Sequence, residues 1–497
     1  MKKKWLIGIF FLSQQHIYAA DDDTQLRLNQ ELQQQQLQIE HQFKQQQNID
    51  SHSLPTMVID GEAIQVQPNV EEVGRALYIA VMQKQWQAAQ IYLNRYLSFK
   101  DHDLSLVYFA QASLARVQGQ TKQAEHLFQQ ALELQPDNMI IRLELARLWT
   151  EQQKNKEAKQ LFEQVKQHLV SANDQISQNI NHTIDVYLKT LNQRDTWQGN
   201  VALGMRHATN INNSSERYTL VPTIVGVDAN GEYIIRDLKQ GTPDPIDASA
   251  LDYETVISKR WSLVGQHGLA LKALGYGKSY QKQSDYNEST LNINVGYSFQ
   301  NPRNQILVAP VFEHRRYAND TLSNAYGMRA EWMRFIGQDK ALKLEAEIED
   351  IDHILYEKQS GIEKSIFLTF WKVLPQQWTL FSGLDYVDHN TEEQYFAAYE
   401  QQGVRFGLSK PITEGVNLTV FSSLRWRQYD QYVNGFGFDT RRHDFEQNYT
   451  AVLQMPKFTL YGLTLNLTYN YNQNKSNVDW LYSNDKQSLS LKFEYKF

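Results

Sequence analysis

The sequence predicts an α + transmembrane β protein, in which N-terminal tetratricopeptide-like helical repeats are followed by a 14-stranded antiparallel outer-membrane β-barrel. Three features predict this fold. Residues 70–192 carry small and aromatic residues at a period of 34 positions. Residues 193–497 form short segments in which apolar and polar side chains alternate, separated by polar turns. The chain also ends in an amphipathic strand whose last residue is aromatic.

Residues 1–20 are predicted to be a secretory signal peptide. A basic run at Lys2–Lys4 precedes a short apolar run at Trp5–Leu12, and small residues at Ala19–Ala20 follow. The apolar run is too short to cross a bilayer as a helix. Residues 21–69 are rich in glutamine and poor in apolar side chains, which predicts a polar tether rather than a packed domain.

Residues 70–192 are predicted to form a periplasmic domain of tetratricopeptide-like helix pairs. Such repeats place small residues where paired helices approach and an aromatic residue between successive repeats. Their stack presents a concave surface that can bind an extended peptide, although a plain helical bundle acting as a spacer also fits the pattern. The predicted packing and groove positions are Ala112, Ala124, Phe128, Ala131, Pro136, Ala146, Ala158 and Phe162.

Residues 193–497 are predicted to form the barrel, with strands near 197–209, 250–263, 266–280, 287–299, 304–317, 323–336, 340–355, 362–374, 377–389, 396–410, 414–428, 442–456, 458–473 and 486–497. The count must be even, because the repeats and the end of the last strand lie on the same side of the membrane. Short turns, such as 300–303 and 410–413, alternate with longer links. The link at 210–249 is long enough to suggest a function beyond connecting two strands.

Charged residues on the polar faces of these strands are predicted to point into the lumen. An arginine or lysine facing lipid would cost about 2–4 kcal/mol at the bilayer midplane, whereas the lumen is polar. Both a role in guiding a passenger and simple solvation of the lumen fit this placement. The predicted lumen charges are Lys343, Glu345, Glu347, Glu349, Arg425 and Arg427.

The last predicted strand, 486–497, is amphipathic and would form the edge of a sheet. In a soluble protein this amphipathic edge would invite pairing with other chains. In a barrel it closes against the first strand, and its apolar face meets outer-membrane lipid. It is similar to the signal that bacterial barrel-assembly machinery reads, except that Lys492 stands where that pattern often has glycine. The apolar positions are Leu489, Leu491, Phe493, Tyr495 and Phe497.

Composition and motifs narrow the possible functions. The chain has no cysteine, which excludes disulfides, thiolate metal sites and cysteine nucleophiles. Its net charge of −7 gives no indication of nucleic-acid binding. A mean hydropathy of −0.56 excludes only helical membrane proteins, because a barrel has a polar inner face. No HExxH, GxSxG, Walker A or dinucleotide-binding motif is present, so we expect no catalysis, cofactor or metal site.

The whole mature chain resembles the surface lipoprotein assembly modulator (Slam) family, the translocons of the type XI secretion pathway. The resemblance rests on domain order, barrel size, the repeat positions at Ala124, Phe128, Ala158 and Phe162, and the strand Leu489–Phe497. It implies an outer-membrane translocon that carries surface lipoproteins, or secreted haem- and metal-acquisition proteins, from periplasm to cell surface. The implied partners are the client protein, periplasmic chaperones and the barrel-assembly machinery, with the translocon itself a monomer.

Two other classes remain open at this stage. Exopolysaccharide export porins also join such repeats to a barrel, but usually with longer repeat arrays and larger barrels. A passive porin or haem receptor would explain the barrel and leave the repeats without a role.

Overall fold

The computed structural model describes residues 58–59, 62–63, 66–169, 175–228, 230–391, 397–413, 415–432, 441–460 and 462–497. The predicted signal peptide lies outside these residues, as does most of the predicted tether. Two short strands, β1 (Val58–Ile59) and β2 (Glu62–Ala63), pair with each other ahead of the helices.

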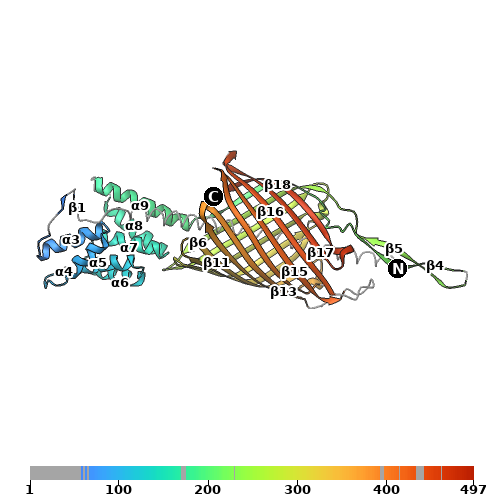
Figure 1. The fold of residues 1–497 in the computed structure, drawn as a ribbon, viewed down its shortest axis with the longest axis horizontal. Helices are drawn as coiled ribbons and strands as arrows, with labels where there is room; N and C mark the ends of the chain where they lie inside the picture. The colour runs from blue at the N-terminus through green and yellow to red at the C-terminus, as the bar shows by residue number, and fades with distance from the viewer. Residues whose placement is uncertain are drawn as a thin grey trace.

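A domain of antiparallel helix pairs occupies one end of the molecule, as the sequence predicts (Figure 1). Among the described residues, α3 packs on α4, α5 on α6, and α7 on α8, and the longer α9 leads into the barrel. No helix in this described part of the chain is long and apolar enough to cross a membrane. The helices are α3 (Val70–Met82), α4 (Trp86–Tyr96), α5 (Leu104–Val117), α6 (Thr121–Leu134), α7 (Met139–Glu151), α8 (Asn155–Leu169) and α9 (Gln175–Arg194).

The first helix of each pair begins at a side-chain cap. The carboxylate or amide oxygens of Asn69, Asp103 and Asn138 accept backbone N–H groups that the first helical turn leaves without partners. The turns within the helix pairs share a backbone conformation, because Lys84, Gly119 and Gln153 all have a positive φ. Only one of these three is a glycine, so the tight turn is imposed by the packing of the two helices.

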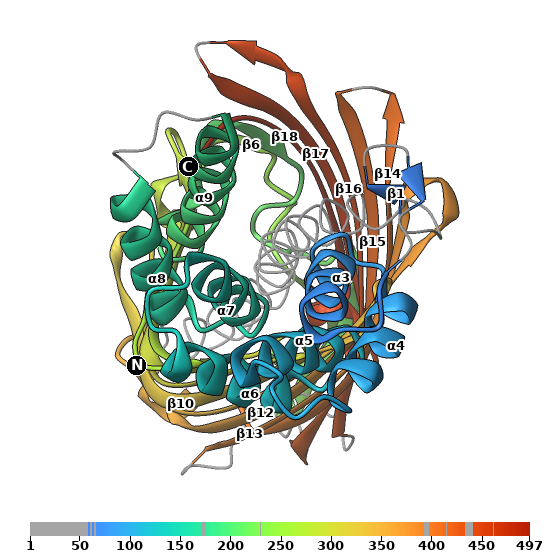
Figure 2. The same cartoon turned by 90° about the vertical axis from the view of Figure 1, so that its left-hand side faces the viewer.

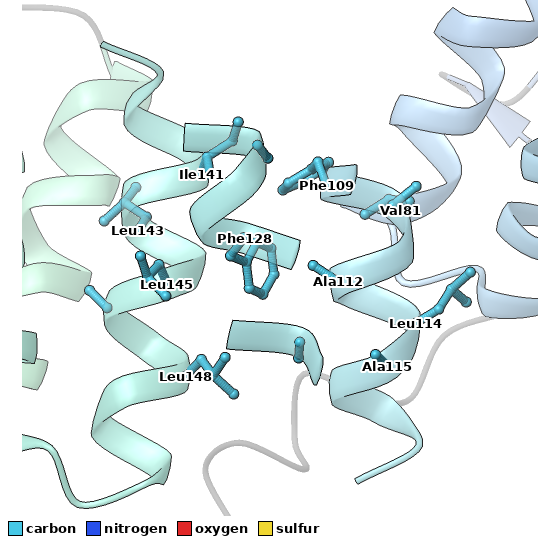
Figure 3. Packing of buried hydrophobic residues seen from close by; sticks show 14 of the residues in the cluster. Val81, Phe109, Ala112, Leu114, Ala115, Phe128, Ile141, Leu143, Leu145 and Leu148 are labelled. Atoms are coloured by element: carbon cyan, nitrogen blue, oxygen red, sulfur yellow. The ribbon is translucent and has the colours of Figure 1, made fainter. Parts of the chain in front are cut away.

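The core of the helical domain runs continuously through all the helix pairs. Figure 3 shows the part of this core around Phe128. Phe128 is fully buried, and its ring lies 6.1 Å from that of Phe109 on the neighbouring helix. In the next repeat, the ring of Phe162 stacks at 5.0 Å on Tyr187 of α9. The aromatic position of each repeat therefore fills the space between helices, and α9 closes the last pair.

Strands β3 and β6–β18 form a closed, antiparallel, 14-stranded barrel, which confirms the predicted strand number and direction (Figure 1). Successive strands are neighbours, and β18 pairs with β3 to close the cylinder. The strands are β3 (Gln198–Ala208), β6 (Ala248–Ser262), β7 (His267–Tyr280), β8 (Glu288–Gln300), β9 (Asn304–Tyr317), β10 (Asp320–Ile336), β11 (Lys340–His353), β12 (Gly361–Leu374), β13 (Trp378–Thr391), β14 (Tyr399–Thr413), β15 (Val416–Tyr432), β16 (Arg441–Leu460), β17 (Leu463–Ser476) and β18 (Asn484–Lys496).

Two predicted connections need correction. Residues 410–413 are not a turn, because β14 continues to Thr413 and its pairing with β15 shifts register after Pro411. A proline lacks an N–H, so a bulge at this point keeps the strand paired beyond it. The strand predicted at 323–336 begins earlier, because β10 starts at Asp320 and only Ala318–Asn319, both with positive φ, connect it to β9. This geometry is that of a tight hairpin turn.

The long link between β3 and β6 forms a hairpin of its own at the end of the barrel opposite the helices (Figure 1). Its strands, β4 (Tyr218–Val227) and β5 (Tyr233–Gly241), pair only with each other in the described structure. A third short element at this end is α10 (Asp479–Tyr482), between β17 and β18.

The two faces of the barrel can be tested by paired substitutions near the middle of β12. Ile366 points outward and is 50% exposed, whereas Ser365 points inward and pairs with Glu347 of β11. An arginine on the outer face costs about 2–4 kcal/mol near the midplane, so Ile366→Arg should sharply reduce assembly. Ser365→Arg places its charge beside carboxylates and should be tolerated. The yield of heat-modifiable folded barrel in outer membranes measures assembly, and equal yields would contradict the assigned faces.

Candidate functional site

The helical domain contains a groove between the first helices of three successive pairs, α3, α5 and α7. A cavity of about 330 Å³ lies between them. Its apolar lining includes Tyr78 from α3, Leu106 and Phe109 from α5, and Ile140 from α7. A groove of this kind can hold one or two apolar side chains of an extended polypeptide.

The rim of the groove is polar, and most of its polar groups already have partners. Asp103 caps α5 through the Ser105 N–H at 2.8 Å and also accepts the Gln135 amide at 3.3 Å. Asn138 caps α7. The exposed Arg75 adds a cation beside the apolar floor. Partial burial raises the pKa of Tyr78, so its hydroxyl stays neutral at physiological pH.

The repeat positions singled out from the sequence pack the helices and do not line the groove. Ala112, Ala124, Ala131, Ala146 and Ala158 are fully buried, as are both repeat phenylalanines, and Pro136 is exposed between α6 and α7. The groove residues themselves were missed. Leu106 and Ile140 are separated by the repeat length of 34, so projecting the period onto the first helices could have found them.

Polar contacts fasten the helical domain to the barrel at the turn between β6 and β7. The Gly265 N–H donates to Glu157 Oε1 at 2.6 Å, and the Gln266 amide donates to the Gln152 carbonyl at 2.8 Å. The Ser262 hydroxyl of β6 accepts a hydrogen bond from the Asn155 side-chain amide at 3.2 Å and donates one to Asp195 Oδ1 at 2.7 Å. Viewed along the barrel axis, the helices form an arc over this end of the barrel (Figure 2). The groove is therefore held at the barrel mouth.

The predicted lumen charges on β11 lie on the inner face of the barrel, here called the inner wall. Lys343 is 3% exposed and forms ion pairs with Glu345 and with Glu331 of β10. Glu347 forms an ion pair with Arg329 of β10 at 2.7 Å. Glu349 is also buried, while the residues between them, such as Ile348 at 47%, are exposed on the outside. Most of these charges are thus neutralised by partners on neighbouring strands.

A second inner-wall cluster contains the predicted Arg425 and Arg427 of β15. Arg427 pairs with Glu446 at 3.1 Å, and its guanidinium lies 4.5 Å from the ring centre of Tyr399. Arg425 lies 3.7 Å from Asp385. In the same cluster, Asp385 also binds Arg405 at 2.7 Å, and Arg442 lies between the rings of Tyr429 and Tyr482 at 4.2 and 3.5 Å. Arginine–aromatic stacking holds these cations against the wall.

The seam between the last strand and the first explains the unusual lysine of the terminal signal. Lys492 of β18 reaches past β3 to β6, where Nζ lies 2.9 Å from Glu254 Oε2 and 3.3 Å from Asp252 Oδ1. The β3 residue between them is Gly204, where a Cβ would lie 1.9 Å from the Leu491 carbonyl oxygen. The glycine that the terminal signal often has on the last strand is thus on the facing strand, β3. Lys492 of β18 reaches across this glycine and pairs with β6.

The outer face of the same strand carries the apolar positions of the terminal signal. Their side chains, from Leu489 to Phe497, are each at least 38% exposed, while Ser490 and Glu494 are almost fully buried on the inner wall.

Among the described residues, no group of three or more histidine or carboxylate side chains is arranged to hold a metal ion.

Two family models match the chain. One, described as surface lipoprotein assembly modifier, matches residues 197–497. The other, described as the N-terminal TPR repeats of the same family, matches residues 59–162. The chain belongs to the surface lipoprotein assembly modifier family. The barrel therefore lies in the outer membrane and the helical domain in the periplasm, which makes the end with the β4–β5 hairpin extracellular.

Relatives in the same family match over most or all of their length. The hemophilin secretion modulator of Acinetobacter baumannii is 49% identical over 500 residues, covering 100% of both chains. Surface lipoprotein assembly modifier 1 of Neisseria meningitidis serogroup B is 24% identical, covering 84% of this chain and 81% of the relative. The surface lipoprotein assembly modifier of Moraxella catarrhalis is 24% identical, covering 96% and 93%.

Removing the charge of Lys492 should destabilise the closed barrel. Lys492→Met removes the cation that pairs with the buried Glu254 and leaves Asp252 with Arg206 at 3.8 Å. Breaking a buried ion pair on one side costs about 3–5 kcal/mol. The temperature at which the folded band is lost in heat-modifiability gels should fall accordingly. Lys475→Met is the matched control, because Lys475 is exposed near the extracellular end of β17 and its loss should change little.

Neutralising the carboxylates should rescue the lysine variant. Adding Asp252→Asn and Glu254→Gln to Lys492→Met removes the uncompensated negative charge, so the unfolding temperature should recover. No loss in the single variant, or no recovery in the triple variant, would show that the ion pair does not stabilise the seam.

Proposed function

We propose that this protein is an outer-membrane translocon that moves a surface lipoprotein, or a secreted haem- or metal-acquisition protein, from the periplasm to the cell surface. The observation that carries the proposal is the peptide-sized groove held at the periplasmic mouth of the barrel by the Glu157 and Gln152 contacts. Membership of the surface lipoprotein assembly modifier family supports it.

The groove acts by raising the local concentration of the client at the pore. A client segment bound between α3, α5 and α7 stays tethered within reach of the barrel, so its entry becomes an intramolecular event. The outer membrane has no ATP, and folding of the client outside the cell then draws the transport forward. The paired charges of the inner wall offer a polar surface without a large uncompensated field that would trap charged side chains.

The client is a haem-binding secreted protein of the hemophilin type. This choice rests on the 49% identical relative, which is named for the secretion of hemophilin. Periplasmic chaperones deliver the client unfolded, and the barrel-assembly machinery inserts the translocon through its terminal strand. The translocon works as a monomer and catalyses no reaction. The family match favours this function over polysaccharide export or passive diffusion.

Truncating the groove should weaken client capture without affecting the barrel. Tyr78→Ala with Leu106→Ala should lower the export of A. baumannii hemophilin about tenfold when client is limiting, since losing an anchor residue commonly costs 1–2 kcal/mol. Ile91→Ala is the matched control, because Ile91 is 67% exposed on α4 and does not line the groove.

Export is measured as hemophilin released from cells in which the protein is the sole translocon of its family. Barrel levels in the outer membrane are measured in parallel. Unchanged export both in the double variant and after deletion of residues 70–190 would contradict the capture role.

A further inference from the structure

Two carboxylates on the inner wall depart from the pairing of opposite charges described above. Glu349 of β11 and Glu363 of β12 lie directly opposite each other in the strand register, and both side chains point into the lumen. Like charges directly opposite each other destabilise a pair of strands. Glu349 and Glu363 are here called the carboxylate pair. They lie near the extracellular end of the barrel, where β11 ends at His353 and β12 begins at Gly361.

Glu349 is buried without a partner for one of its oxygens. The residue is 8% exposed, and its Oε1 has no hydrogen bond within the described part of the chain. On the side away from Glu363, the facing residue is Gly327 of β10, which has no side chain to donate a hydrogen bond. A Cβ at Gly327 would lie 2.7 Å from Glu349 Cγ. Burial of an unpaired charge is unfavourable, so this position favours the approach of a cation.

Two arginines on the neighbouring strands are already bound to other carboxylates. Arg315 of β9 pairs with Glu313 on the same strand, and Arg329 of β10 pairs with Glu347 at 2.7 Å. Each of these cations therefore compensates a carboxylate of its own. The carboxylate pair adds two further negative charges to this side of the lumen.

Glu363 connects the buried Glu349 with the lumen. The Glu363 side chain is 27% exposed, so a ligand in the lumen can reach it. The Tyr399 hydroxyl donates to Glu363 Oε2 at 3.2 Å, and His389 Nδ1 lies 3.6 Å from the same oxygen. The guanidinium of Arg427 lies 4.5 Å from the ring centre of Tyr399, so a guanidinium fits against the wall at this level.

The arrangement fits an organic cation better than a metal ion. A calcium or magnesium ion needs several oxygen ligands at about 2.0–2.6 Å from one point. Within the described residues, no group of three or more histidine or carboxylate side chains meets that need. A guanidinium is larger and planar, and its N–H donors point outward in a fixed fork. It can therefore bind two carboxylates that are too far apart to share one metal ion.

We propose that the carboxylate pair binds arginine and lysine side chains of the client as the unfolded chain leaves the barrel. This inference rests on the proposed function, which brings a polypeptide past this level of the lumen, and adds a binding site to it. A basic side chain between Glu349 and Glu363 offsets the repulsion of the two carboxylates and opposes return of that segment to the periplasm. Because Glu363 is partly exposed to solvent, the bound side chain can be released again.

The test compares two double variants of the full-length protein in nanodiscs. Glu349→Gln/Glu363→Gln, the carboxylate variant, removes both charges with little change in shape. Glu357→Gln/Glu400→Gln is the matched control, because it removes the same formal charge from two exposed residues at the same end of the barrel. The probe is N-acetylated tetra-arginine amide, and its affinity is measured by titration calorimetry. The carboxylate variant should bind the peptide about tenfold more weakly than wild type, and the control should bind it as wild type does.

A stability measurement separates ligand binding from a structural role. The carboxylate variant should unfold at the wild-type temperature or above it, because its facing side chains no longer repel each other. The peptide should raise the unfolding temperature of wild type and of the control, but not that of the carboxylate variant. Equal peptide affinities in all three proteins would overturn the inference. So would calcium chloride alone if it raised the wild-type unfolding temperature as the peptide does, or a lower unfolding temperature in the carboxylate variant without peptide.

Export of A. baumannii hemophilin separates this inference from the proposed function. Cells with the carboxylate variant should release less hemophilin than cells with wild type, whereas the control should release as much. Full release by the carboxylate variant would overturn the inference and leave the translocon role standing. Failure of wild type to export hemophilin, while peptide binding still depends on the carboxylate pair, would overturn the proposed function and leave the cation site standing.

Discussion

Closure of the barrel by β18 against β3 is the interaction on which the rest of the structure depends. In hydrocarbon each backbone N–H and C=O needs a partner within the protein, so an open sheet edge is not tolerated. The pairing from Lys496–Asn200 to Ser488–Ala208 removes both edges. Its outer face is apolar for lipid, and its inner face is tied by Lys492 to Asp252 and Glu254 across Gly204.

The closed barrel carries a different accessory element at each of its two ends. At the periplasmic end, the β6–β7 turn receives α8 through Gly265 and Glu157, so the groove of the helical domain stays at the barrel mouth. At the extracellular end, the β3–β6 link becomes the β4–β5 hairpin and is fastened beside the start of β18 through Asn210. Both accessory elements are thus attached near the closing strands, the groove at the periplasmic end and the β4–β5 hairpin at the extracellular end.

The inner wall between these ends is polar but largely charge-compensated. Arg329 with Glu347 and Arg427 with Glu446 pair across neighbouring strands, and Arg427 and Arg442 lie over the rings of Tyr399 and Tyr429. Sequence alternation identified which residues face inward, but could not pair them. Whether a lumen charge is free or compensated depends on the register between strands, which alternation alone leaves undetermined.

The sequence by itself determined the strand number, the antiparallel closure, and the repeats at Phe128 and Phe162, because period-two and period-34 patterns report directly on which side chains are buried. Only the tertiary structure decided the partners of Lys492, since Glu254 lies 238 residues earlier in the chain. The same holds for the groove at Leu106, which residues of three separate helices form. Local patterns record what a segment buries, whereas contacts between distant segments arise only when the barrel closes and the helices stack.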